Sequence, residues 1–99
     1  MKGIVLGNYQ VVLNKVDIMD ITDFLFENAN KEVEIVYNSE LEVLLFKTNR
    51  ATLVKIVEAD RVTTISNRTQ KFEAAYLYSV LNNILVTELI IESEVIPAC

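Results

Sequence analysis

The chain has 99 residues, 52% of them hydrophobic, and its nine basic and fourteen acidic residues give a net charge of −5. It has no histidine, and its one cysteine, Cys99, is the last residue. This composition excludes imidazole acid–base catalysis, serine–histidine and cysteine–histidine couples, histidine metal sites and an internal disulfide.

Length and composition predict a single compact domain over residues 1–99. Two glycines and one proline leave little room for linkers. No apolar run approaches the ~18 residues of a membrane span, and the first residues lack the hydrophobic stretch of a signal peptide. With a single cysteine, these features predict a cytoplasmic protein, in a cell or an infected host, that does not enter a membrane.

The first predicted element is a β-hairpin. Apolar runs at 4–6 and 9–13 flank Gly7, and glycine first in a two-residue loop is typical of a type II′ turn. This turn pairs Leu6 with Tyr9, which places Ile4 opposite Val11 on the same face. A single strand running through Gly7 is the alternative.

A helix is predicted next, at 18–29, with Asp17 as its N-cap. One face carries apolar residues at helical spacing: Ile18, Ile21, Leu25 and Ala29. Four acids fall within about 120° of arc on the opposite side: Asp17, Asp20, Asp23 and Glu27. We name these four the acidic stripe and expect it to bind a protein partner with a basic surface. It lacks the glycine-containing loop of a calcium hand, so we predict neither a metal site nor a cofactor here.

A second hairpin follows the first helix. A two-residue loop at 38–39 would pair Ile35 with Glu42 and mix polar and apolar residues on both faces. A three-residue loop at 38–40 instead pairs Ile35 with Val43 and gives one apolar face. We therefore predict the three-residue loop, with an opposite face of mixed character that another element covers in part.

Two further strands are predicted in the middle of the chain. Residues 52–57 are rich in β-branched side chains, which favours a strand, although a short helix capped by Asn49 is the alternative. A strand at 62–65 completes a meander packed on the first helix.

The longest predicted element is a second helix at 68–85, opened by a capping-box pattern at Asn67 or by Ser66. A final strand is expected at 86–96. The helix is apolar over much of its circumference, which indicates a central helix or one shared with a partner. As a homo-oligomer interface we predict Tyr76, Tyr78, Val80 and Ile84.

Charge is unevenly distributed along the chain. Residues 1–46 carry three bases and eight acids, residues 47–71 six bases and two acids, and residues 72–99 four acids and no base. The basic middle segment lacks interleaved aromatic residues and belongs to a protein of pI about 4.6, so direct nucleic-acid binding is not expected.

No residue set is typical of catalysis, so no catalytic residue is predicted. We expect an α+β domain of five to six short, mostly antiparallel strands and two helices, in the order β-β-α-β-β-β-(β)-α-β. The expected function is that of a small, acidic, non-enzymatic protein-interaction domain that blocks or regulates a partner. Inhibitors of host nucleic-acid-binding enzymes, as viruses and phages encode, have this character. The alternative is a homo-oligomeric structural or small-ligand-binding subunit.

Overall fold

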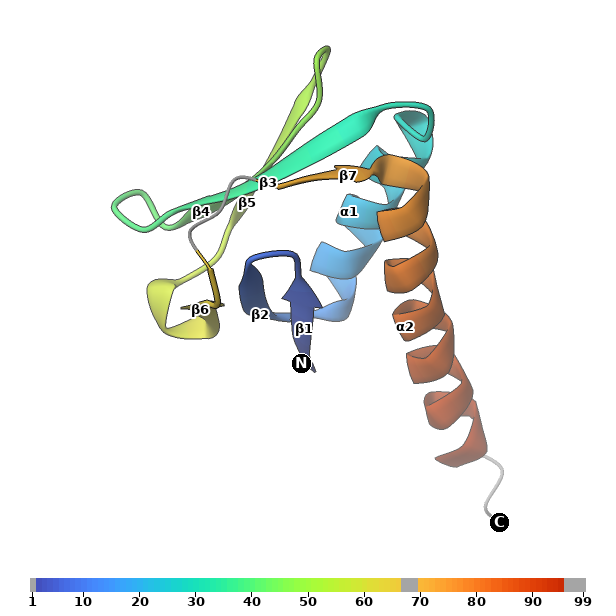
Figure 1. Ribbon diagram of the computed structural model, residues 1–99. Helices are drawn as coiled ribbons and strands as arrows, with labels where there is room; N and C mark the ends of the chain where they lie inside the picture. The colour runs from blue at the N-terminus through green and yellow to red at the C-terminus, as the bar shows by residue number, and fades with distance from the viewer. Residues whose placement is uncertain (1, 67–69, 96–99) are drawn as a thin grey trace.

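The computed structural model describes residues 2–66 and 70–95, which form two antiparallel sheets and two helices (Figure 1). The predicted α+β class is confirmed, as is the order of elements up to the second helix. The elements are β1 Lys2–Leu6, β2 Tyr9–Leu13, α1 Lys15–Glu27, β3 Glu32–Asn38, β4 Val43–Lys47, β5 Thr52–Ile56, the 3₁₀ turn η1 Ala59–Arg61, β6 Val62–Thr64, β7 Lys71–Glu73 and α2 Ala74–Val95.

The strands form two sheets rather than the single meander expected from the sequence. One sheet has the order β1-β2-β6 and the other the order β5-β4-β3-β7. The chain leaves the second sheet after β5, pairs β6 with β2, and returns to pair β7 with β3. These long-range pairings have no local sequence signal, which is why the sequence did not reveal them.

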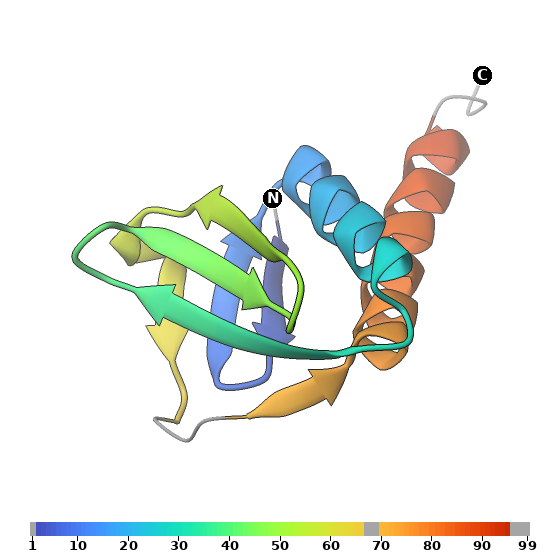
Figure 2. The ribbon, with the colours of Figure 1, turned by 90° about the horizontal axis from the view of Figure 1, so that it is seen from above.

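The core lies between the two sheets and the helices (Figure 2). Both helices lie to one side of the sheets and pack against each other. Buried side chains come from both sheets and both helices: Ile4, Leu6, Val11, Leu13, Ile18, Ile21, Leu25, Val33, Ile35, Leu44, Phe46, Val57, Ala74, Leu77 and Leu81.

The β1–β2 hairpin has the predicted register, with Leu6 opposite Tyr9. Gly7 has a φ of 60°, in the left-handed region that favours glycine. A β-carbon at Gly7 would lie 2.7 Å from the ring of Phe72 on β7. The turn therefore needs glycine both for its backbone conformation and for the close approach of Phe72.

Two tyrosines connect the sheets. The rings of Tyr9 on β2 and Tyr37 on β3 lie 6.4 Å apart in an edge-on arrangement, and the Tyr9 hydroxyl accepts the Tyr37 backbone N–H. The Tyr37 hydroxyl donates to the carbonyl of Val57 at 2.6 Å. Burial, with the nearby carboxylates of Glu42 and Asp60, raises the pKa of Tyr37 above its usual value.

The first helix begins one turn earlier than predicted. Asn14, not Asp17, is the N-cap, because its side-chain oxygen accepts the backbone N–H of Asp17 at 2.8 Å. The helix ends at Glu27, and the side chain of its C-cap residue Asn28 donates to the Phe24 carbonyl, so Ala29 lies beyond the helix. Asparagine and aspartate are equally good caps, and the sequence alone does not separate them.

The predicted register of the β3–β4 hairpin is wrong. Ile35 pairs with Phe46, not with Val43, because the loop spans four residues, 39–42. The Asn38 side chain accepts backbone N–H groups from the loop, and Glu42 adopts a φ of 53°. The pairing partner of Ile35 is thus shifted along β4 from Val43 to Phe46, an odd number of residues, which moves Leu44 and Phe46 to the core face.

β5 confirms the strand at 52–57 over the helical alternative. The second helix differs from the prediction at both ends. Lys71–Glu73 form a strand, so the helix starts at Ala74, and the cap predicted at Asn67 lies outside the described residues. Residues 86–95 continue the helix where a strand was expected. Residues 81–90 contain no glycine and no proline, so no helix-ending residue stands at the boundary that was predicted between 85 and 86.

Candidate docking surface

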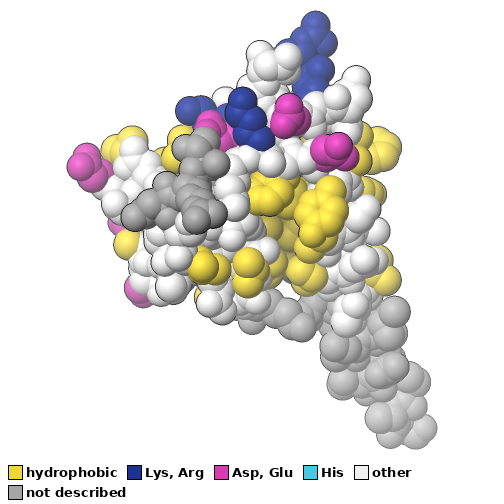
Figure 3. Space-filling view, in the orientation of Figure 1, with side chains coloured by type: hydrophobic (Ala, Val, Ile, Leu, Met, Phe, Trp, Pro, Cys, Tyr) yellow, Lys and Arg dark blue, Asp and Glu magenta, His cyan; other side chains and the backbone are white. Residues whose placement is uncertain are grey.

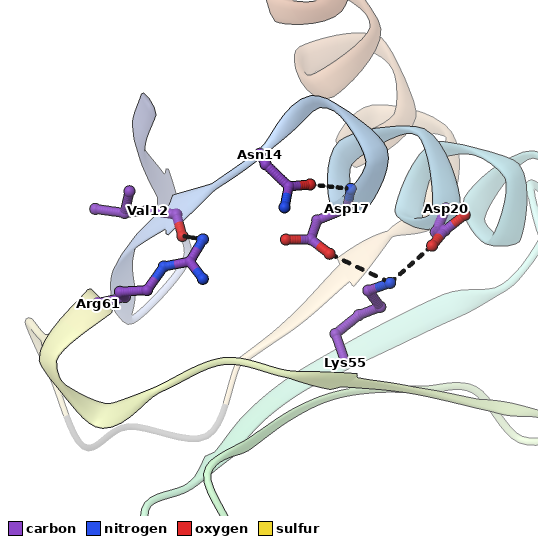
Figure 4. A network of polar contacts seen from close by, with 6 residues as sticks. All are labelled: Val12, Asn14, Asp17, Asp20, Lys55 and Arg61. Carbon is purple, nitrogen blue, oxygen red and sulfur yellow. Dashed lines mark hydrogen bonds and ion pairs between the residues drawn. The ribbon is translucent and has the colours of Figure 1, made fainter. Parts of the chain in front are cut away.

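The structure divides the acidic stripe into a paired and an exposed half. Lys55 on β5 lies 2.7 Å from the Asp20 carboxylate and 3.3 Å from that of Asp17 (Figure 4). The Asp17 side chain is 15% exposed and that of Asp20 48% exposed. Asp23 and Glu27, further along α1, are exposed and make no ion pair in the described structure.

The Lys55 ion pairs keep that side chain charged. The hydrogen bond from Lys55 to Asp20 raises the pKa of Lys55 above its usual value, although partial burial opposes this shift. The bridge therefore persists through neutral pH and fixes α1 against β5. The basic segment at 47–71 is correspondingly divided, because Lys55 faces α1 while Lys47, Arg50 and Lys71 are exposed.

Exposed apolar side chains border the stripe on α1 itself. Val16 is 64% exposed, Met19 46% and Phe26 67%. At 100° per residue, Met19 and Phe26 lie on the side of the acids that faces away from β5, and Val16 lies among the acids, between Asp23 and Glu27. The Phe26 ring also contacts the Tyr78 ring of α2, with centroids 5.7 Å apart.

A second apolar area covers the outer face of the four-stranded sheet. Val36, Leu45 and Val54 are cross-strand neighbours on β3, β4 and β5, and Val43 pairs with Ile56 in the next row. Val54 is 53% exposed and Ile56 78% exposed. We name these five residues the outer-face patch. This face turns to the viewer in Figure 2, and no described helix or strand covers it.

The sequence predicted a partly apolar outer face but assigned it the wrong β4 residues, because these depend on the register of the β3–β4 hairpin. In the predicted register Val43 and Leu45 belonged to the buried face and Leu44 and Phe46 to the outer one. The observed pairing exchanges the two sets. The outer face therefore keeps its predicted mixed character with different β4 residues, and no described helix or strand covers it.

Beside the patch, the same sheet face becomes charged. A hollow of about 560 Å³ is lined by Asn30, Lys31, Glu32, Glu34, Lys47, Thr48, Asn49 and Lys71. Lys47, Glu34 and Lys71 occupy one cross-strand row of β4, β3 and β7. Lysine and arginine side chains gather at the top of the molecule in Figure 3. The sheet face thus has an apolar end and an end of mixed charge.

The residues predicted as an oligomer interface do not share one face. Tyr76, which is 60% exposed, and the half-buried Val80 and Ile84 follow one another at four-residue spacing along one side of α2. Tyr78 points elsewhere, toward Phe26 of α1. A hollow of about 320 Å³ between β1 and α2 includes Ile84 in its lining. Figure 3 shows hydrophobic side chains between the β1–β2 hairpin and α2.

The described residues contain no cluster of three carboxylate or thiolate side chains that could hold a metal ion. Across the same residues, neither helix has the length and apolarity to cross a membrane. Comparison with protein-family models, curated proteins and solved structures gives no match to this chain. The surface just described is therefore the basis on which a function is inferred.

Proposed function

We propose that this chain is a small non-enzymatic protein-interaction domain that binds a partner bearing both basic and apolar residues, and that it blocks or regulates that partner. The observation that carries the proposal is the position of the acidic stripe between two exposed apolar areas. The outer-face patch lies on the β5 side, and Met19 and Phe26 lie on the other.

Two contributions to binding act together at this surface. Exposed contiguous apolar surface on a small domain marks an interaction site, because burying it removes apolar area from water. The carboxylates of Asp23 and Glu27 attract a basic surface and select its orientation. An inhibitor of a nucleic-acid-binding enzyme is one protein of this kind, since the groove of such an enzyme is basic.

Partner capture from cells of the source organism, compared between variants, tests the proposal. Asp23→Lys with Glu27→Lys should abolish capture, and Ile56→Lys should weaken it at least tenfold. The matched control is Glu32→Lys with Glu73→Lys, which makes the same change in charge at the opposite edge of the sheet. All variants should stay folded, because these residues are exposed. Equal capture by the α1 variant and its control would reject the acidic-stripe proposal.

The second candidate function is self-assembly through α2, which the exposed Tyr76 and the hollow at Ile84 on the same helix favour. Light scattering separates the two candidates. A particle of more than one chain that Tyr76→Asp dissociates supports self-assembly, and a mass of one chain that does not vary with concentration excludes it.

A further inference from the structure

The free edge of β5 has a defined hydrogen-bonding pattern. β5 is the last strand of its sheet, so one side of its backbone has no neighbouring strand. The Val57 N–H donates to the Glu42 carbonyl, and the Thr48 N–H to the Ala51 carbonyl. Backbone groups of an antiparallel strand alternate in direction, so those of 52, 54 and 56 point away from β4.

These outward groups are accessible. Ile56 is 78% exposed and Val54 53% exposed, and Thr52 is also exposed. No backbone hydrogen bond from another described segment reaches them. Natural edge strands are commonly protected by an outward-facing lysine, a proline or a bulge. β5 has none of these, because its only lysine, Lys55, turns inward to α1.

The two sides of this edge differ in chemistry. Side chains of Val54 and Ile56 extend the apolar outer-face patch, whereas that of Lys55 lies on the inner side against the acids of α1 (Figure 4). A strand added beside β5 would alternate its side chains between these two environments. Its outer positions would contact valine and isoleucine, and its inner positions would approach the half-exposed Asp20 and the exposed Asp23.

We propose that the partner contributes an extended segment that pairs with β5 as an added strand, with apolar residues alternating with lysine or arginine. This proposal rests on the proposed function and specifies how the partner binds. Lys55 already shows the inner-side contact within the chain, because its ammonium bridges Asp17 and Asp20 from a β5 position. The apolar positions then bury the exposed parts of Val54 and Ile56.

A second copy of this chain is a poorer occupant of the same edge. Twofold pairing of β5 with β5 would continue the apolar face and would bring a second Lys55 to the edge. It would also place two acidic stripes beside the same short strand, and each keeps exposed carboxylates at Asp23 and Glu27. Like charges within about 10 Å repel one another at moderate salt. A basic partner strand has no such repulsion.

Peptide titration of the whole chain tests the strand geometry. The probe is an acetylated and amidated peptide of alternating lysine and valine, and the comparison peptides are alternating glutamate and valine and a lysine–valine peptide arranged in two blocks. Binding is followed by NMR, and amide hydrogen exchange is measured at 52, 54 and 56. We expect the alternating lysine–valine peptide to bind at least tenfold more tightly than either comparison peptide and to slow exchange of these three amides.

Val54→Pro tests whether the peptide bonds to the outward backbone groups of β5. It removes an N–H that points away from β4 and leaves the ladder between β4 and β5 intact. It should weaken peptide binding at least tenfold. Peptide binding without slower exchange in the unaltered chain, or equal binding of the block peptide, would overturn strand addition whether or not the proline variant folds. Concentration-dependent dimerisation that slows the same amides would also overturn it, in favour of a second copy.

Partner capture distinguishes failure of this inference from failure of the proposed function. Loss of capture with Ile56→Lys, but not with folded Val54→Pro, means that the patch binds a partner without strand pairing. Unchanged capture with Ile56→Lys and with the α1 charge reversal rejects the docking surface itself.

Discussion

Replacing Gly7 by alanine should destabilise the domain through two separable effects. An L-residue held at the Gly7 φ of 60° costs about 1–2 kcal/mol. The new β-carbon would also lie 2.7 and 2.8 Å from two ring atoms of Phe72, and moving that ring from its packed position costs about 1–3 kcal/mol. The sum is about 2–5 kcal/mol, a large part of the stability of about 5–15 kcal/mol typical of a domain.

Urea unfolding followed by circular dichroism measures this loss, and thermal unfolding should show it as a fall of about 4–8 °C for each kcal/mol. The control is Gly3→Ala, whose β-carbon would lie at an ordinary 3.5 Å from Gln10 and whose φ is not in the left-handed region. It should stay within about 1 kcal/mol of the unaltered protein. Adding Gly7→Ala to a Phe72→Ala background should cost only the backbone part, about 1–2 kcal/mol. Equal unfolding midpoints for Gly7→Ala and Gly3→Ala would refute the turn conformation and the contact with Phe72 together.

Two other changes test the contacts that join the layers. Tyr37→Phe should lower the unfolding free energy by about 0.5–1.5 kcal/mol, because the Val57 carbonyl loses its 2.6 Å hydrogen bond; no change in urea unfolding would contradict that bond. The raised pKa of Tyr37 means that the folded state holds the phenolic proton more strongly than the unfolded state does. The contribution of this group to the free energy of unfolding should therefore be complete below pH about 10 and fall as the pH rises past it. This alkaline loss, followed by urea unfolding from pH 8 to 11, should be smaller in Tyr37→Phe. Lys55→Met should lower the free energy of unfolding by about 0.5–1 kcal/mol at low salt and by less at 1 M salt, where the Debye length is about 3 Å. A loss that is the same at both salt concentrations would show that the Lys55 ion pairs do not stabilise the fold.

What the sequence predicted well was local. The β1–β2 register follows from one glycine, and the buried face of α1 follows from the spacing of Ile18, Ile21 and Leu25, all of which are buried. The β3–β4 register depended on a loop whose length is set by the Asn38 side chain and by a glutamate in the left-handed region, which few glutamates adopt. Because a shift by an odd number of residues exchanges the two faces of a strand, that one error assigned Leu44 and Phe46, rather than Val43 and Leu45, to the outer face.

The acidic stripe shows a different limit of sequence reasoning. Its four carboxylates lie on one helix face as predicted, but sequence spacing gave no reason to place Lys55 next to Asp17 and Asp20, since 35 residues separate Lys55 from Asp20. That pairing turns the only lysine of β5 inward and leaves Thr52, Val54 and Ile56 to form an uncharged edge. An unprotected apolar edge is an aggregation hazard for a free protein. A domain that retains such an edge beside the acidic stripe has the surface expected for binding a basic, extended partner segment.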